Sequence, residues 1–145
     1  MTLPATSAAC LHASTVALNG RAVLITGASG SGKSGLALDL ISRGATLVAD
    51  DRTWVERGPD GTLTARAPDT ITGRIEARGI GILALPDHGP ARVVLTVDLD
   101  HPSPARLPPR ITVNIAGAQI DLINGAQTPN LGAVIHLILC GASLS

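Results

Sequence analysis

The glycine-rich segment at residues 27–34, GASGSGKS, constrains the fold of this chain most strongly, because it fits the pattern G-x-x-x-x-G-K-[ST] at every fixed position. In this pattern the glycines let backbone N–H groups curl around phosphate oxygens, and the following helix adds its positive dipole end. The pattern needs an apolar strand before it and a helix after it. The sequence offers both, at residues 22–26 and 33–41. We therefore expect an α/β fold built around a strand, a phosphate loop and a helix.

The residues of this loop are candidate ligands of a nucleotide. Lys33 would reach the β- and γ-phosphates, and the Ser34 hydroxyl would hold Mg²⁺. The alternative, a flexible Gly/Ser loop, does not explain why the sole lysine of the chain stands at the one position that requires an ammonium. The predicted nucleotide-binding residues are Gly27, Ala28, Ser29, Gly30, Ser31, Gly32, Lys33 and Ser34.

Alternating or apolar runs bounded by turn residues predict the other elements. Residues 13–18 and 22–26 flank Asn19-Gly20, a pair that favours a type I′ hairpin turn, and residues 53–57 and 62–67 flank a second turn rich in Gly and Pro. The sequence further predicts a helix at 33–41, strands at 45–49, 92–98 and within 111–123, a short helix at 71–77, an exposed proline-rich connection at 101–110, and a helix at 130–140.

Composition narrows the class of protein. The chain has 145 residues, 11 basic and 11 acidic side chains, and a single aromatic residue, Trp54. Without a basic stripe or aromatic faces we expect no nucleic-acid partner. We expect no signal peptide and no membrane contact, because the apolar runs fall short of the ~20 residues that a spanning helix needs. The expectation is one cytoplasmic domain, residues 1–145, with Cys10 and Cys140 as ordinary buried thiols.

Acidic residues follow the predicted strand at 45–49. Asp50 could steady Mg²⁺ at the end of this strand, and the adjacent Asp51 could then take a proton from an acceptor hydroxyl. A solvated Asp-Asp turn is the alternative. Farther along, Glu76 and Arg78 precede a glycine, where an ordinary salt bridge is the simpler interpretation. For His12, a hydrogen-bonded strand histidine is likewise the simpler one.

Taken together, these segments resemble the HPr kinase/phosphorylase family, whose members modify a serine of HPr, the phosphocarrier protein of the sugar phosphotransferase system. The resemblance rests on Leu11-His12 ahead of the loop, the loop itself, the block from Arg43 to Asp51, and the signature Glu76-Ala77-Arg78-Gly79-Ile80-Gly81-Ile82. It covers residues 11–85. The chain is similar to the short form of the family, which has the catalytic domain alone.

The resemblance implies a P-loop core on a mixed β-sheet, similar to phosphoenolpyruvate carboxykinase, with ATP and Mg²⁺ as cofactors and a hexameric assembly. It implies catalytic roles for His12, Lys33, Asp51, Arg78 and Arg106. It implies metal-binding roles for Ser34, Asp50 and Glu76. Among these, Asp51 would be the base that accepts the serine proton. The family's Pro-Val-Arg-Pro-Gly-Arg-Asn segment corresponds to residues 120–125, which contain neither arginine, and this puts phosphorylase activity in doubt.

The leading hypothesis from sequence is a kinase that transfers the γ-phosphoryl group of ATP to a serine of HPr or a similar phosphocarrier. A non-catalytic nucleotide sensor that binds a signalling or transport partner is the first alternative, although a sensor needs fewer acidic groups near the metal. A small-molecule kinase is the second alternative. It would need a lid, for which the proline-rich residues 101–110 are too rigid.

Overall fold

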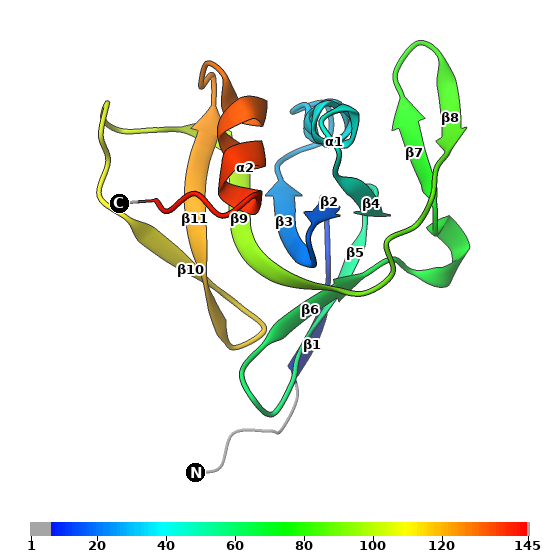
Figure 1. Ribbon diagram of the computed structural model, residues 1–145, viewed down its shortest axis with the longest axis horizontal. Coiled ribbons are helices and arrows are strands. Elements are labelled where there is room, and N and C mark those ends of the chain that lie inside the picture. Colours follow the sequence, from blue (N-terminus) through cyan, green and yellow to red (C-terminus); the bar gives the residue numbers. More distant parts are fainter. Residues whose placement is uncertain (1–6, 145) are drawn as a thin grey trace.

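The computed structural model describes residues 7–144, whose strands build one nine-stranded mixed sheet and a separate two-stranded hairpin (Figure 1). The strands of the main sheet are β1 (Ser7–Leu11), β2 (Ala13–Leu18), β3 (Arg21–Thr26), β4 (Thr46–Ala49), β5 (Thr53–Arg57), β6 (Leu63–Arg66), β9 (Ala91–Pro102), β10 (Ile111–Ile115) and β11 (Ala118–Ala126). The hairpin consists of β7 (Arg74–Ala77) and β8 (Gly81–Ala84), and the helices are α1 (Lys33–Ser42), the 3₁₀ turn η1 (Asp69–Ile71) and α2 (Leu131–Leu139). The expected α/β architecture with a mixed sheet is confirmed.

Strand directions bring several strand ends to one edge of the sheet. The strand order is β1-β5-β6-β9-β3-β2-β4, and β11 pairs with β9 while β10 pairs with β11. β3, β9 and β11 are parallel to one another, whereas β2 is antiparallel to both β3 and β4. The ends of β3, β4, β9 and β11 therefore lie at the same edge as the start of β2. Ligands of open α/β sheets bind at such an edge.

Local sequence signals explain how the chain enters and leaves the glycine-rich loop. Asn19 and Gly20 have φ angles of 55° and 76°, the positive pair that a type I′ turn requires, so β2 and β3 form the predicted hairpin. α1 begins at Lys33, directly after the loop. It ends where Gly44, with φ 111°, turns its N–H back to the carbonyl of Ile41. The loop is thus held between a paired strand and a capped helix.

Two apolar clusters bury the two faces of β3. Val23 and Ile25 belong to the cluster that packs against α1 and α2, which both lie on one face of the sheet (Figure 1). Ala22 and Leu24 point the other way, into a cluster formed by the strands themselves. This alternation follows from the two-residue period of a strand. The strand that carries the loop is therefore buried on both sides, and its end is firmly positioned.

Several sequence predictions need correction. Residues 71–77 do not form a helix, because Gly73 adopts φ 72° and the chain then runs into β7, where Ile75 is buried and its neighbours Arg74 and Glu76 are exposed. The proline-rich connection is shorter than expected, since β9 continues to Pro102.

The prediction for the cysteines is also wrong. Both Cys10 and Cys140 are exposed free thiols. Cys10 lies on β1, a strand that the sequence analysis did not predict, and Cys140 follows the last residue of α2. Within residues 7–144 no helix is long and apolar enough to cross a membrane.

Candidate functional site

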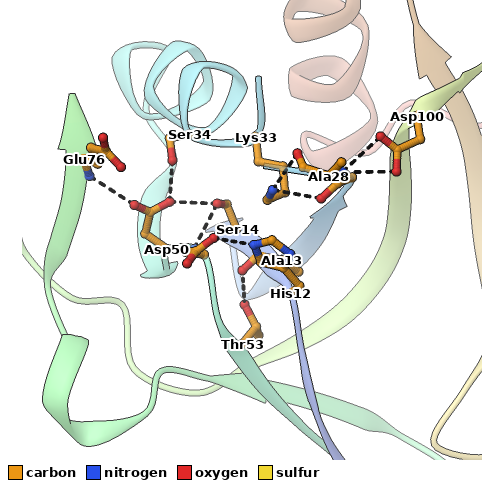
Figure 2. Close-up of polar contacts among 12 residues, drawn as sticks. His12, Ala13, Ser14, Ala28, Lys33, Ser34, Asp50, Thr53, Glu76 and Asp100 are labelled. Carbon is orange, nitrogen blue, oxygen red and sulfur yellow. Dashed lines mark hydrogen bonds and ion pairs between the residues drawn. The ribbon is translucent and has the colours of Figure 1, made fainter. Parts of the chain in front are cut away.

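The lysine of the glycine-rich loop is folded back onto the backbone of the loop (Figure 2). The Lys33 ammonium donates hydrogen bonds to the carbonyl oxygens of Gly27 (2.8 Å) and Ala28 (3.1 Å), and Lys33 is only 5% exposed. An ammonium has three N–H donors, so one remains for an anion above the loop. At Gly27, which has φ 148°, an added Cβ would lie 2.5 Å from Ser31 Oγ, so the first position of the motif requires glycine.

Asp50 follows the end of β4 and is the centre of a buried hydrogen-bond network (Figure 2). Its Oδ1 accepts hydrogen bonds from the hydroxyls of Ser34 and Ser14, each at 2.7 Å. Its Oδ2 accepts a hydrogen bond from the backbone N–H of Glu76 at 3.0 Å. The carboxylate thus joins the start of α1, the strand β2 and the hairpin strand β7, three elements that are far apart in sequence.

The pair of Ser34 and Asp50 suits a magnesium ion. Mg²⁺ is held by one or two carboxylates together with substrate phosphates and water, rather than by a complete cage of protein ligands. Consistently, residues 7–144 contain no group of three or more His, Cys, Asp or Glu side chains that could hold a metal ion by themselves. An ion bound at this pair would complete its coordination with nucleotide phosphates.

Asp51 lies next to Asp50 in sequence but has a different environment. Asp51 Oδ1 is 2.6 Å from His12 Nε2; the side chain of Asp51 is 64% exposed and that of His12 is 48% exposed. The backbone of Asp51 has φ 66°, and the N–H of Arg52 reaches across it to the carbonyl of Asp50 at 2.7 Å. Such strained single residues cluster at functional sites. One aspartate is therefore buried among hydroxyl donors, whereas its neighbour faces solvent with a histidine as partner.

In the part of the chain that the structure describes, the side chains of the other predicted site residues do not take part in this hydrogen-bond network. Glu76 approaches Asp50 only through its backbone, and its side chain is exposed. Arg78 lies in the turn between β7 and β8, and Arg106 lies in the exposed segment after β9. Among the hydrogen bonds and ion pairs within residues 7–144, none joins either arginine to Asp50, Asp51 or the glycine-rich loop.

Ser14 belongs to the site, although the sequence analysis did not single it out. Ser14 is fully buried, and its hydroxyl donates to Asp50 while accepting the N–H of Asp51 at 3.2 Å. It therefore links the two aspartates. The available signal was a pair of polar residues, Ser14 and Thr15, inside an otherwise apolar strand.

Asp100, near the end of β9, is a second residue that the sequence analysis missed. Its two carboxylate oxygens accept hydrogen bonds from the Ala28 N–H at 3.0 and 3.1 Å, so it ties β9 to the loop. Asp98 braces this contact by accepting the N–H of Asp100 at 2.7 Å. Asp98 is also 2.7 Å from His101 Nδ1, and this hydrogen bond raises the pKa of His101 above its usual value of 6.5.

Comparison with known proteins identifies the family. The sequence model described as HPr Serine kinase C-terminal domain matches residues 5–97. The HPr kinase/phosphorylases of Halalkalibacterium halodurans and of Clostridium botulinum (strain Eklund 17B / Type B) are each 48% identical over 73 residues, which make up 50% of this chain and 24% of each relative. The match therefore spans less than a third of those curated relatives.

A solved structure is similar over almost the whole chain. The Hpr(Ser) kinase/phosphatase from Coxiella burnetii matches with a TM-score of 0.75 and 28% identity, covering 91% of this chain and 94% of that one. The structural match extends beyond residue 97, where the sequence match of the family ends. By its sequence match, its fold and the arrangement of its strands, this chain belongs to the HPr serine kinase C-terminal domain family.

Proposed function

We propose that this chain is an ATP- and Mg²⁺-dependent serine kinase that phosphorylates HPr or a similar phosphocarrier. In this proposal residues 1–145 act as one catalytic domain, with a P-loop core of the phosphoenolpyruvate carboxykinase type. The observation that carries the proposal is one hydrogen-bond network. Within it Ser14 bonds to both Asp50 and Asp51. Asp50 also accepts a hydrogen bond from Ser34 of the loop, and Asp51 is hydrogen-bonded to His12. The printed names of the relatives, HPr kinase/phosphorylase and Hpr(Ser) kinase/phosphatase, support the same class of reaction.

The environment of each residue suggests its role. Mg²⁺ held by Ser34 and Asp50, with Glu76 nearby, would neutralise charge on the ATP phosphates. Lys33 is already oriented by the loop carbonyls and offers its remaining N–H to the transferred phosphoryl group. Asp51 is exposed, so an acceptor serine can reach it, and its carboxylate takes the serine proton.

His12 acts in this proposal as the partner that orients the carboxylate of Asp51. Arg78 and Arg106 would offset phosphoryl charge only after ATP and the acceptor have bound, since neither contacts the network beforehand. Residues 120–125 lack the two arginines of the family's phosphorolysis segment, so we expect transfer to serine rather than its reversal. Hexameric assembly, which the family resemblance implies, and a cytoplasmic location, which the sequence analysis expects, remain predictions.

The kinase proposal is tested by incubating the protein with γ-labelled ATP, Mg²⁺ and a panel of HPr-type phosphocarriers. We expect phosphoserine on at least one carrier. Asp51→Asn should abolish this transfer and leave ATP affinity close to that of the unmodified protein, because Asp51 touches neither Lys33 nor Ser34. Asp69→Asn, at an exposed aspartate of η1, is the matched control and should transfer normally.

Two outcomes would contradict the proposal in different ways. ATP binding without phosphoserine on any carrier would favour the nucleotide sensor. Equal loss of transfer and ATP affinity in Asp51→Asn would make Asp51 a structural residue, and the assignment of the base would then be wrong.

A further inference from the structure

The peptide group between Gly27 and Ala28 is held at both of its polar ends (Figure 2). Its carbonyl oxygen, on Gly27, accepts a hydrogen bond from Lys33 Nζ at 2.8 Å. Its N–H, on Ala28, donates to the two carboxylate oxygens of Asp100 at 3.0 and 3.1 Å. Because a peptide group is planar and trans, its N–H and C=O point in opposite directions. Asp100 of β9 and the sole lysine of the chain therefore bind opposite ends of one rigid unit.

This peptide group needs an external constraint because it follows a glycine. Gly27 has φ 148°, and a residue without Cβ lets the next peptide group rotate at little cost. A half-turn would direct the N–H towards the ammonium of Lys33 and the C=O towards the carboxylate of Asp100. Both contacts would then be repulsive, since an ammonium has no acceptor and a carboxylate has no donor. The carboxylate of Asp100 thus selects the orientation in which the Gly27 carbonyl faces Lys33.

The constraint originates in the paired part of the sheet. Asp98, two residues before Asp100, is paired with Thr26 of β3 and with Asn124 of β11. Its Oδ1 accepts the N–H of Asp100 at 2.7 Å, which fixes the chain where Asp100 approaches the loop. The side chain of Asp100 is exposed, so its substitution opens no gap in the core. Asp100 can therefore act on the loop without being needed for the packing of the fold.

The orientation of the Lys33 ammonium depends on this arrangement. The ammonium also donates to the carbonyl oxygen of Ala28 at 3.1 Å, and this oxygen accepts the N–H of Ser31 at 3.0 Å. Two of its three N–H donors are thereby used, and the tetrahedral nitrogen gives the third donor a single direction. Loss of the contact with Gly27 would leave one hydrogen bond, about which the other donors are free to turn.

We propose that Asp100 is a positioning residue that orients Lys33 for phosphate binding through the peptide group between Gly27 and Ala28. The inference rests on the proposed function, because it takes Lys33 as the group that meets the transferred phosphoryl group. Asp100 needs no contact with phosphate or acceptor to act in this way. Its negative charge near the loop would by itself weaken the binding of a phosphate anion. The positioning effect and the charge effect therefore have opposite signs and can be separated.

The test measures the affinity for inorganic tripolyphosphate in Mg²⁺ by titration calorimetry. Asp100→Ala should weaken binding by about tenfold, or about 1.4 kcal/mol, although it removes a negative charge near the ligand. Asp100→Asn should bind at least as tightly as the unmodified protein, because its amide oxygen can still accept the N–H of Ala28. In a Lys33→Met background, Asp100→Ala should no longer weaken binding. Asp69→Ala, at an exposed aspartate of η1, is the matched control and should bind normally.

Unchanged or tighter binding in Asp100→Ala, an equal loss in Asp100→Asn, or a loss that persists in the Lys33→Met background would each overturn the positioning role. An NMR measurement tests the contact without a ligand. The amide proton of Ala28 should move upfield in Asp100→Ala, and an unmoved resonance would overturn the contact and the inference, but not the proposed function. Absence of tripolyphosphate binding to the unmodified protein would instead overturn the phosphate site, and with it both the proposed function and this role of Asp100.

Discussion

Replacing Ser14 by alanine should destabilise the fold measurably, because its hydroxyl serves two buried groups at once. The substitution removes a hydrogen bond to the carboxylate of Asp50, and bonds to charged groups contribute about 1.5–3 kcal/mol. It also leaves the N–H of Asp51 without its partner, which costs about 1–3 kcal/mol when the group is buried. Asp50 keeps two other donors and the N–H of Asp51 is only partly buried, so we expect a total of about 2.5–3.5 kcal/mol, at the lower end of the combined range.

Urea unfolding followed by the fluorescence of Trp54, the only tryptophan, measures this loss directly. For a domain of this size the corresponding decrease in Tm is roughly 5–10 °C. Ser103→Ala is the control. It removes an exposed hydroxyl that bonds only to the backbone around Ala105, and should change the free energy of unfolding by less than about 0.5 kcal/mol. If Ser14→Ala were as stable as this control, the account of Ser14 as the link between the two aspartates would be refuted.

Three further predictions follow from individual contacts. An NMR titration of His101 should give a pKa above 6.5, and Asp98→Asn should return this pKa towards 6.5. The stabilising contribution of the pair is complete below the pKa of the unfolded chain and is lost as the pH rises through the raised pKa. A titration midpoint at or below 6.5 would contradict this prediction. Gly132→Ala should be less favourable with Asp39 present than in an Asp39→Ala background, because its Cβ would displace the carboxylate of Asp39; a double-mutant cycle measures this difference, and additive effects would exclude the clash. Lys33→Met should weaken the binding of inorganic tripolyphosphate by roughly tenfold or more and leave the circular dichroism spectrum unchanged. Unchanged affinity would show that Lys33 does not belong to the proposed phosphate site.

Much of the fold could be predicted from the sequence because its signals are local. The Asn19-Gly20 turn, the glycine-rich loop and the capped helix α1 each depend on neighbouring residues, and all three are found as expected. The helix predicted at 71–77 was wrong because the local signal in these residues is ambiguous. Its apolar spacing is compatible with a helix or a strand over so short a run, and pairing with β8 decides for the strand.

The candidate site could be predicted only in part, because its contacts are long-range. Lys33 and Ser34 lie in a contiguous motif, but the bond from Ser14 to Asp50 spans 36 positions and that from Ala28 to Asp100 spans 72. No local pattern marks Asp100, and the polar pair Ser14-Thr15 does not show which residues it would contact. Both Ser14 and Asp100 gain their roles from strands that become neighbours only in the folded sheet. These contacts depend on the order of the strands in the sheet, and sequence periodicity does not determine that order.

The parallel pairing of β3 with β9 has a consequence for the order of events during synthesis. β3 and β2 can form their hairpin as soon as both have left the ribosome, yet the second neighbour of β3 is β9, which is translated only after α1 and five further strands. Pairings between strands so distant in sequence form slowly. A nascent chain that already displays the complete glycine-rich motif thus still lacks Asp100, which anchors the loop, and acquires it only when the later part of the chain has been made.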